Sequence, residues 1–151
     1  SVDPPTVEAY LALLVVANDV ARERERFLGA RGIAEGRFVV LMFLMQHDEG
    51  RSSPSELAER SGVTRATMTG LVDGLERDGL VARTSHPEDR RRTVVELTAS
   101  GQGFLDDLLP DYFRFTTAVM GKLGASERAT LVKLLGKVKQ GAAAVAQGGA
   151  S

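Results

Sequence analysis

SPSELAERSGVTRATMTGLVDGLERDGLVARTSHPEDRRRTVVELT, residues 53–98, is the segment around which the rest of this chain is arranged. It opens on Ser53-Pro54, a serine that can cap a helix and a proline that suits the first helical position. Glu56 stands three residues after the serine and completes the pattern of a capping box. Gly62 can take the left-handed backbone conformation that commonly ends a helix. The pattern predicts a short helix between the proline and the glycine.

A second helix is expected directly after this turn. Thr64 can cap it and Gly79 can end it. Its apolar residues recur at the spacing of one helical face, and they are Met68, Leu71, Val72 and Leu75. Two helices joined by a short turn with a glycine form a helix-turn-helix, whose second helix is slim enough to enter the major groove of DNA.

Two short β-prone runs follow, residues 80–84 and 93–97, and they enclose the polar segment His86-Pro87-Glu88-Asp89-Arg90-Arg91-Arg92. This segment forms turns readily and is too charged for a core, so we expect a hairpin. Behind a helix-turn-helix such a hairpin is a wing, and its arginines suit the narrow and strongly negative minor groove. The alternative is a hairpin that is simply solvated.

At these residues the chain resembles the MarR family of bacterial transcription regulators. Asp89-x-Arg91, followed by Leu97-Thr98, is similar to the wing signature of that family. The runs 55–58 and 71–81 are similar to its two motif helices. These motifs cover about a third of the chain, and the order of the predicted elements covers nearly all of it. The resemblance implies a triangular homodimer in which two winged helices point outward.

The expected fold is mainly α-helical with a small β-wing, within a single chain of residues 1–151. A winged helix-turn-helix lobe is expected over residues 33–98. Helices in residues 6–28 and 99–146 are expected to form a dimerisation layer, because they carry more apolar surface than a compact monomer of this size needs. The alternative is a monomeric helical bundle.

Glycine and proline are expected to interrupt the helices outside the motif. Glycines punctuate a loop over residues 29–36, and the almost wholly apolar run 38–45 predicts a helix buried on most sides. Pro110 is expected to kink or briefly interrupt the long helix after the wing. The tail from Gln147 is rich in small residues and is expected to fray.

Composition excludes several classes of protein. The chain has no cysteine, which rules out disulfides, cysteine metal sites and thiol redox sensing within it. No apolar run approaches the ~18 residues that span a bilayer, and no signal peptide is visible. We therefore expect a cytoplasmic protein without a membrane partner.

The net charge of −1 is unusual for a protein that binds nucleic acid. Residues 51–100 hold eight arginines and eight acidic residues, so this third of the chain is neutral as well. Electrostatic attraction to DNA must then depend on where the charges lie. The clearest concentration is the run of three arginines, residues 90–92.

Candidate DNA contacts come from both helices of the motif and from the wing. Arg65 stands at the start of the second helix, where it can bind guanine in a bidentate manner, and the methyl groups of Ala66, Thr67 and Thr69 can meet thymine. The complete set is Ser53, Ser55, Thr64, Arg65, Ala66, Thr67, Thr69, Gly70, Arg77, Asp89, Arg90 and Arg91. The alternative for the helix residues is an ordinary exposed face.

Two glycines depart from the pattern of the family. Gly70 and Gly74 occupy positions in the second helix where relatives often have arginine or another long polar residue. Each costs the helix about 1 kcal/mol relative to alanine, and neither can contact a base through a side chain. Either Gly70 lets the backbone approach DNA closely, or wing and shape recognition carry more of the specificity.

Other sites are less well marked. Phe38, Met42, Met45 and Phe104 can line a pocket for a small aromatic effector, as the family resemblance implies; the alternative is plain core. His47-Asp48-Glu49 offers ligand types for a metal, but adjacent residues at a helix end are better interpreted as solvated. No nucleophile, base and orienting group stand out, so we expect no enzyme, no cofactor and no metal.

The residues and the resemblance together predict a DNA-binding transcriptional regulator. We expect a repressor in preference to an activator. It is expected to bind palindromic, inverted-repeat operators in double-stranded DNA as a homodimer and to be released by a small-molecule effector. The alternative is a winged-helix module that binds proteins and never touches DNA. The neutral charge of residues 51–100 favours the alternative, and the arginines of the wing argue against it.

Overall fold

The structure is a computed structural model that describes residues 3–148, and it divides into two compact units, residues 1–110 and 111–151. The first unit holds α1 to α4, the three strands and the start of α5. The elements are α1 (Pro4–Gly29), α2 (Glu35–Gln46), β1 (Arg51–Ser52), α3 (Pro54–Ser61), α4 (Arg65–Arg77), β2 (Val81–Ser85), β3 (Thr93–Leu97), α5 (Ala99–Met120) and α6 (Ala125–Gly148). The predicted fold class, mainly helical with a small antiparallel wing, is confirmed.

Helix α2 forms the centre of the first unit. Phe38, Val40, Leu41 and Leu44 are all buried, as the apolar run predicts. The helix begins at Glu35, whereas the glycine loop was expected to reach residue 36. The predicted end of the loop is therefore wrong, and Gly36 belongs to the helix. Packing explains the difference, because a Cβ at this glycine would lie 3.1 Å from Cδ2 of Leu71 in α4.

Helix α3 begins and ends as the sequence predicts. The Oγ of Ser53 accepts a hydrogen bond from the backbone N–H of Glu56 at 3.2 Å, and the carboxylate of Glu56 accepts one from the N–H of Ser53 at 3.2 Å. The same carboxylate accepts a bond from the hydroxyl of the buried Ser52 at 2.8 Å. Gly62 ends the helix with φ of 67°. The entry angle of α3 into the motif is therefore defined locally.

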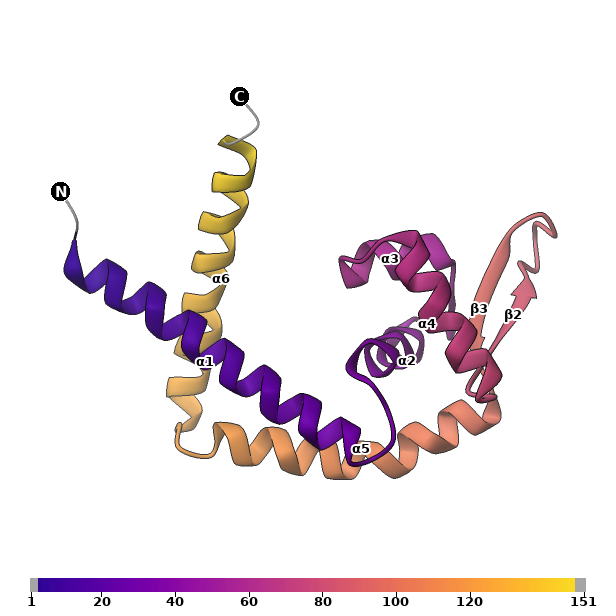
Figure 1. Cartoon of the computed structure of the whole chain (residues 1–151), viewed down its shortest axis with the longest axis horizontal. Helices are drawn as coiled ribbons and strands as arrows, with labels where there is room; N and C mark the ends of the chain where they lie inside the picture. Colours follow the sequence, from indigo (N-terminus) through magenta and orange to yellow (C-terminus); the bar gives the residue numbers. More distant parts are fainter. Residues whose placement is uncertain (1–2, 149–151) are drawn as a thin grey trace. The chain divides into compact units, whose positions relative to one another are not determined.

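Helix α4 is amphipathic and follows α3 after a short turn. Thr64 caps it by accepting a bond from the N–H of Thr67 at 3.1 Å. Met68, Val72 and Leu75 are buried, and the opposite face is exposed. Figure 1 shows α3 and α4 next to the two long strands of the wing.

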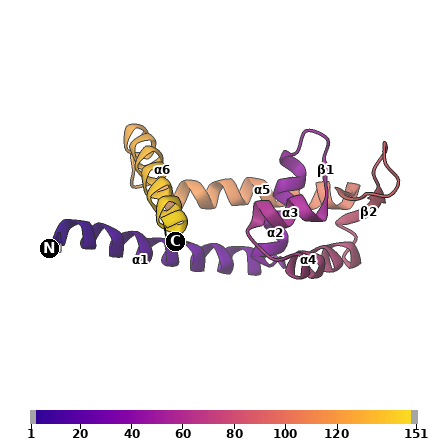
Figure 2. The ribbon, with the colours of Figure 1, turned by 90° about the horizontal axis from the view of Figure 1, so that it is seen from above.

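The sheet has three antiparallel strands in the order β1-β3-β2. Strand β2 begins at Val81, one residue later than predicted, and β3 has the predicted bounds. The two-residue strand β1 was not predicted; it pairs Arg51 with Glu96 and Ser52 with Val95. The loop between β2 and β3, residues 86–92, projects beyond α2, α3 and α4, as Figures 1 and 2 show. We call this segment the wing loop.

Helix α5 starts against the sheet and continues through its proline. The hydroxyl of Thr98 donates to the carbonyl of Gly79 at 2.6 Å and accepts from the N–H of Gly101 at 3.0 Å. A Cβ at Gly101 would lie 2.0 Å from the carbonyl oxygen of Leu80, so only glycine fits there. Pro110 does not interrupt α5, which is one helix from Ala99 to Met120, so that part of the prediction is wrong; a kink at Pro110 stays a prediction. The proline removes one helical hydrogen bond, and those of its neighbours hold the helix.

The second unit, residues 111–151, is described over 111–148 and contains the rest of α5 and helix α6. The carboxylate of Glu127 accepts a bond from the N–H of Gly124 at 2.7 Å and so supports the start of α6. The predicted fraying from Gln147 is wrong for the described part, because the helix runs to Gly148; residues 149–151 lie outside the described residues. In residues 3–148, no helix is both long and apolar enough to cross a membrane.

Candidate nucleic-acid interface

The predicted contact residues of α4 share its exposed face. Thr64 to Thr67, Thr69, Gly70 and Arg77 are all exposed, opposite the buried stripe. The hydroxyls of Thr67 and Thr69 are bonded within the helix, to Thr64 Oγ1 at 3.0 Å and to the carbonyl of Arg65 at 2.9 Å. Their methyl groups therefore remain available for apolar contacts.

The two glycines of α4 have different surroundings. Gly70 is exposed, and a Cβ there would meet nothing within 4 Å. Gly74 is buried, and a Cβ there would lie 2.2 Å from Nη2 of Arg37 in α2. Arg37 crosses α4 at this glycine and forms an ion pair with Asp78 at 2.9 Å. Gly74 therefore accommodates a tertiary contact, and Gly70 alone of the two lies on the candidate DNA face.

Arg83 of β2 joins the wing to the recognition helix. Its guanidinium pairs with Asp73 and, at 3.4 Å, with Glu76, both in α4. Its backbone N–H also donates to the Glu76 carboxylate at 3.0 Å. The side chain of Arg83 is 28% exposed, more shielded than the usual surface ion pair. We call these three residues the wing bracket.

The placement of charge explains how a neutral lobe can attract an anion. The carboxylates of Asp73, Glu76 and Asp78 are occupied by Arg83 and Arg37. In contrast, four arginine side chains make no ion pair, no hydrogen bond and no contact with an aromatic ring within residues 3–148: Arg65, Arg77, Arg90 and Arg92. All four are exposed and belong to α4 or the wing loop. The unpaired positive charge of the lobe therefore lies on α4 and on the projecting wing loop, where it can attract an anion.

The wing loop is closed by backbone bonds. The N–H of His86 donates to the carbonyl of Arg92 at 2.8 Å, and the N–H of Arg92 donates to the carbonyl of Asp89 at 3.0 Å. Asp89 and Arg91 form an ion pair at 3.2 Å, and this pair lies within the loop and does not cross the hairpin. The Arg91 side chain is 92% exposed, so solvent weakens the pair. Arg90 is exposed in the turn between them.

The serines at the start of α3 have unequal roles. Ser53 is half-buried and serves as the helix cap, and Ser55 is exposed. The interface residues predicted from sequence thus fall on three neighbouring parts of one lobe: the first turn of α3, the exposed face of α4 and the wing loop. The sequence did not predict the wing bracket, because charged residues in a strand and a helix do not indicate which of them will pair.

The predicted effector residues differ in burial. Phe38 is buried, and Met42, Met45 and Phe104 are partly exposed. None of them lines the two clefts that adjoin His47. The His47-Asp48-Glu49 segment was expected to be a solvated helix end, and residues 3–148 contain no group of three side chains that could hold a metal ion.

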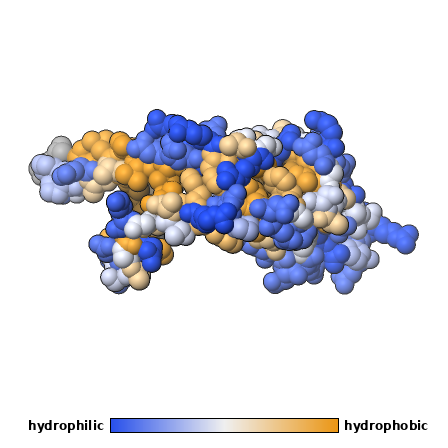
Figure 3. Space-filling model, turned by 90° about the horizontal axis from the view of Figure 1, so that it is seen from below, coloured by the Kyte–Doolittle hydropathy of each residue, from blue (hydrophilic) through white to orange (hydrophobic). Residues whose placement is uncertain are grey.

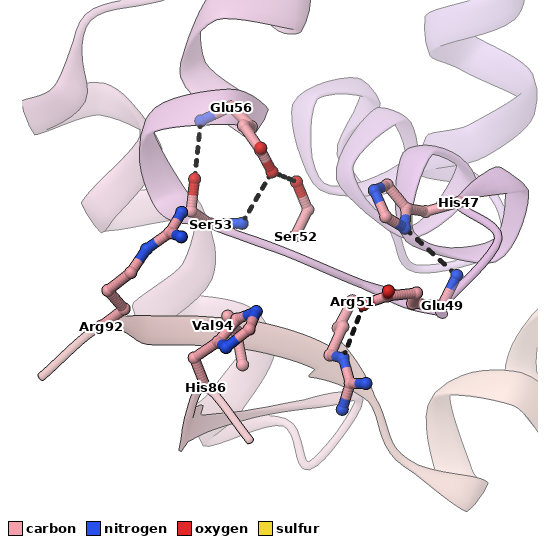
Figure 4. A pocket seen from close by; sticks show the side chains of 9 residues that line it. All are labelled: His47, Glu49, Arg51, Ser52, Ser53, Glu56, His86, Arg92 and Val94. Atoms are coloured by element: carbon pink, nitrogen blue, oxygen red, sulfur yellow. Dashed lines mark hydrogen bonds and ion pairs between the residues drawn. The ribbon is translucent and has the colours of Figure 1, made fainter. Parts of the chain in front are cut away.

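A polar cleft that the sequence did not predict lies between the start of α3 and the wing (Figure 4). It holds about 130 Å³ and is lined by His47, Glu49, Arg51, Ser52, Ser53, Glu56, His86, Arg92 and Val94. We call it the histidine cleft. Hydrogen bonds from Ser52 and Ser53, together with the nearby His47 and Arg92, lower the pKa of Glu56 below its ordinary value.

Comparison with known proteins identifies relatives over most of the chain. The sequence pattern of the MarR family matches residues 32–92. The HTH-type transcriptional repressor YetL of Bacillus subtilis is 41% identical over 136 residues, which are 90% of this chain and 81% of YetL. The predicted family resemblance is therefore confirmed at the level of sequence.

Solved structures share the fold. Sco3205 of Streptomyces coelicolor, a MarR family regulator crystallised in complex with DNA, has a TM-score of 0.84 at 21% identity and covers 93% of this chain and 89% of its own. BpsR of Bordetella bronchiseptica, whose DNA binding is regulated by 6-hydroxynicotinic acid, has a TM-score of 0.73 at 26% identity, with coverage of 85% and 90%. The relatives are regulators of transcription and not enzymes, in agreement with the expectation from the sequence. The chain belongs to the MarR family of winged helix-turn-helix transcriptional regulators.

Proposed function

We propose that this protein is a transcriptional repressor that binds inverted-repeat operators in duplex DNA as a homodimer. The observation that carries the proposal is the set of exposed arginines without ion pairs on α4 and the wing loop, Arg65, Arg77, Arg90 and Arg92. The name of YetL as a repressor and the complex of Sco3205 with DNA support it. A repressor acts on chromosomal DNA, so the proposed location is the cytoplasm of a bacterial cell.

Helix α4 supplies the sequence-specific contacts. Its exposed first turn enters the major groove, where Arg65 binds the O6 and N7 atoms of guanine and the methyl groups of Ala66, Thr67 and Thr69 pack against thymine. Arg77 lies at the other end of the helix and binds a phosphate. The first turn of α3, with Ser53 and the exposed Ser55, contacts the backbone next to the groove.

The wing supplies the contact with the minor groove. Arg90 is exposed in the wing loop and enters the narrow groove, where the negative potential is strongest. The ion pair between Asp89 and Arg91 orders the loop around it. The wing bracket sets the distance between this contact and those of α4, because it fastens β2 to the recognition helix.

The apolar helices outside the lobe form the dimer interface. Tyr10, Leu11 and Val15 of α1 are each more than half exposed, and Figure 3 shows apolar side chains gathered along the first half of that helix. Helix α6 has no buried residue, yet it carries Val132, Leu134, Leu135, Val138 and Val145. Apolar faces this large are characteristic of association. A second copy of the chain covers them.

A two-fold dimer imposes its symmetry on the operator. The half-site centres therefore lie about one helical turn, ~10 bp, apart on opposite strands. A gel shift with the DNA upstream of the protein's own gene tests the proposal, with the same duplex carrying scrambled half-sites as control. Specific binding to inverted repeats is expected. Binding to direct repeats, or to neither duplex, would contradict it, and the second outcome would favour a module that binds proteins.

A small aromatic effector is the proposed release signal. The support is the regulation of BpsR by 6-hydroxynicotinic acid and the partly exposed Met42, Met45 and Phe104 beside the buried Phe38. Binding there shifts α2, to which both α3 and α4 are packed. Addition of 6-hydroxynicotinic acid and of benzoate to the operator complex tests the idea, with Met42→Ala as the variant that loses the response. Persistence of the complex with every aromatic acid tried would refute it.

A further inference from the structure

The histidine cleft contains both histidines of the chain, although they come from different parts of the lobe. His47 follows the last residue of α2, and His86 follows the last residue of β2. The first turn of α3 and the start of β3 complete the walls. Figure 4 shows the side chains of His86 and Arg92 on the wing side, and those of Ser53 and Glu56 on the α3 side.

Each imidazole is held in one orientation. The Nδ1 atom of His47 accepts the backbone N–H of Glu49 at 3.2 Å, and Nδ1 of His86 accepts the backbone N–H of Glu88 at 3.1 Å. In the neutral ring the proton is therefore on Nε2. A second proton costs each ring this local bond, so a negative charge brought into the cleft would favour protonation.

The permanent charges around the cleft cancel. The adjoining space on the α3 side is lined by His47, Ser52, Glu56, Glu59 and Arg60. Taken together, the walls carry three carboxylates and three guanidinium groups: Glu49, Glu56, Glu59, Arg51, Arg60 and Arg92. Imidazole is the side chain whose charge changes between pH 5 and 8. The state of the two histidines therefore decides whether the cleft attracts an anion.

Most of these permanent charges already have partners. Arg51 pairs with Glu49 at 3.1 Å, and the guanidinium of Arg60 lies 4.2 Å from the ring centre of Phe43. Glu56 accepts hydrogen bonds from Ser52 and Ser53. Arg92 makes no ion pair within residues 3–148 and is exposed, so its guanidinium is available to a ligand.

The position of the cleft indicates which anion it meets. The backbone bond between His86 and Arg92 closes the wing loop, and Arg92 follows Arg90 by two residues. Two residues of chain span at most about 7 Å, and the bond from the N–H of Arg92 to the carbonyl of Asp89 makes this segment a turn. If Arg90 is in the minor groove, the base of the loop therefore stands at the wall of that groove, which is made of phosphodiesters. On the α3 side, Ser55 is exposed and stands next to Glu56 in the chain.

Resting on the proposed function, we propose that the histidine cleft holds a phosphodiester of the operator backbone and that DNA binding protonates His47 and His86. Arg92 supplies the permanent charge for this phosphate. The phosphate adds a negative charge that favours protonation of the two imidazoles. Because the complex takes up protons, operator affinity rises as the pH falls from 8 to 6, by about tenfold per pH unit for each proton fully linked to binding.

Fluorescence anisotropy of a labelled operator at fixed ionic strength, from pH 6 to pH 8, tests this inference. His47→Asn and His86→Asn are matched variants, since the asparagine oxygen can still accept the N–H two residues ahead but does not titrate. The parent should gain at least about tenfold in affinity between pH 8 and pH 6, each single variant less, and the double variant little. Equal pH dependence in parent and double variant would overturn the inference.

Two further measurements separate a bound phosphate from an indirect effect. Isothermal calorimetry in two buffers of different ionisation enthalpy should show proton uptake on DNA binding by the parent, and none by the double variant. Arg92→Gln should weaken operator binding about tenfold at every pH, whereas parental affinity in this variant would overturn the phosphate contact. Failure of the parent to bind operator at any pH would instead overturn the proposed function; binding without proton uptake would overturn this inference alone.

Discussion

Single residues of the interface differ in what they recognise. Arg90 is exposed and its side chain makes no ion pair or hydrogen bond within the described residues, whereas Arg91 is paired with Asp89 within the loop. Arg65 begins α4, the helix that we propose enters the major groove. Loss of a residue that contacts phosphate or lies in the negative potential of the minor groove weakens binding to all DNA sequences alike. Loss of a residue that contacts a base edge changes the preference at one base pair.

The first prediction separates these roles. Arg90→Ala should weaken binding to operator and scrambled duplex alike, by about 1–3 kcal/mol, and lower the salt dependence by about one ion. Arg65→Ala should instead relax the preference at one base pair of each half-site. Asp89→Ala should loosen the loop, with a smaller effect once Arg91 is removed. The measurement is binding over a salt series, and parental affinity of Arg90→Ala for both duplexes would show that the wing is not in the groove.

The second prediction concerns the glycines of α4. Gly70→Ala should raise the free energy of unfolding by about 1 kcal/mol, because the site is helical, exposed and open. Gly74→Ala should gain less, since its Cβ displaces Arg37 from the ion pair with Asp78. Urea denaturation checks both. If Gly70 lets the backbone approach DNA, the stabilised Gly70→Ala protein should also bind operator less tightly; equal gains in stability for the two variants would contradict the packing account.

At the scale of elements, the capping box and the wing bracket hold the recognition elements in place. The box is local, since Ser53 and Glu56 are three residues apart. The bracket joins β2 to α4 through Arg83. We expect it to position the wing loop as well, although none of its three residues lies in that loop. Both depend on charge, so both can be tested without changes to the core.

The third prediction is that the bracket positions the wing. Arg83→Met keeps the aliphatic part of the side chain but releases Asp73 and Glu76. Its effect on operator binding should be coupled to that of Arg90→Ala by at least ~0.5 kcal/mol, because a loosened wing no longer delivers Arg90. Arg37→Met is the control, since Arg37 pairs with α4 but not with the wing. Additive effects of Arg83→Met and Arg90→Ala would show that the bracket does not act through the wing.

The fourth prediction follows from the lowered pKa of Glu56, which the hydrogen bond from Ser52 causes first and that from Ser53 second. A carboxyl whose pKa is depressed in the folded state stabilises the fold above its unfolded pKa. This stabilisation is lost as the pH falls through the folded value. Glu56→Gln should therefore be less stable than the parent at pH 7, and the difference should disappear below the ordinary value of 4.5. If Glu56→Gln stayed less stable than the parent in acid, the loss of stability would come from the changed side-chain geometry and not from the lost charge.

At the scale of the whole molecule, exposed apolar helices outside the lobe require a partner. Leu14 of α1 is 48% exposed and Leu134 of α6 is 51% exposed. The lobe itself has a core of its own, centred on α2 and α4. In the proposed dimer, association decides how many lobes meet the DNA, while each lobe folds around its own residues.

The fifth prediction is that the chain is a symmetric dimer that buries well over ~2,000 Å². Light scattering at micromolar concentration should give twice the chain mass. Leu14→Glu and Leu134→Glu should each shift the protein towards monomer and weaken binding to a full operator far more than to a half-site. Circular dichroism checks that the lobe remains folded. A parental monomer at this concentration would contradict the dimer.

Features of the fold that depend on neighbours in the chain were predictable. The capping box, the turn at Gly62 and the buried stripe of α4 follow rules that act over a few residues, and the structure confirms them. The exposed arginines of the wing loop follow from composition for the same reason. The family resemblance rested on these local patterns, which is why it could be stated before any tertiary contact was known.

Contacts between distant residues were decided by the tertiary structure. Strand β1 exists because Arg51 and Ser52 meet the edge of β3, and Gly74 is buried because Arg37 crosses it. His47 and His86 face one cleft only after the end of α2 and the base of the wing have packed together. A local pattern specifies an element because it controls the backbone within a few residues, but packing of the buried faces selects which side chains meet.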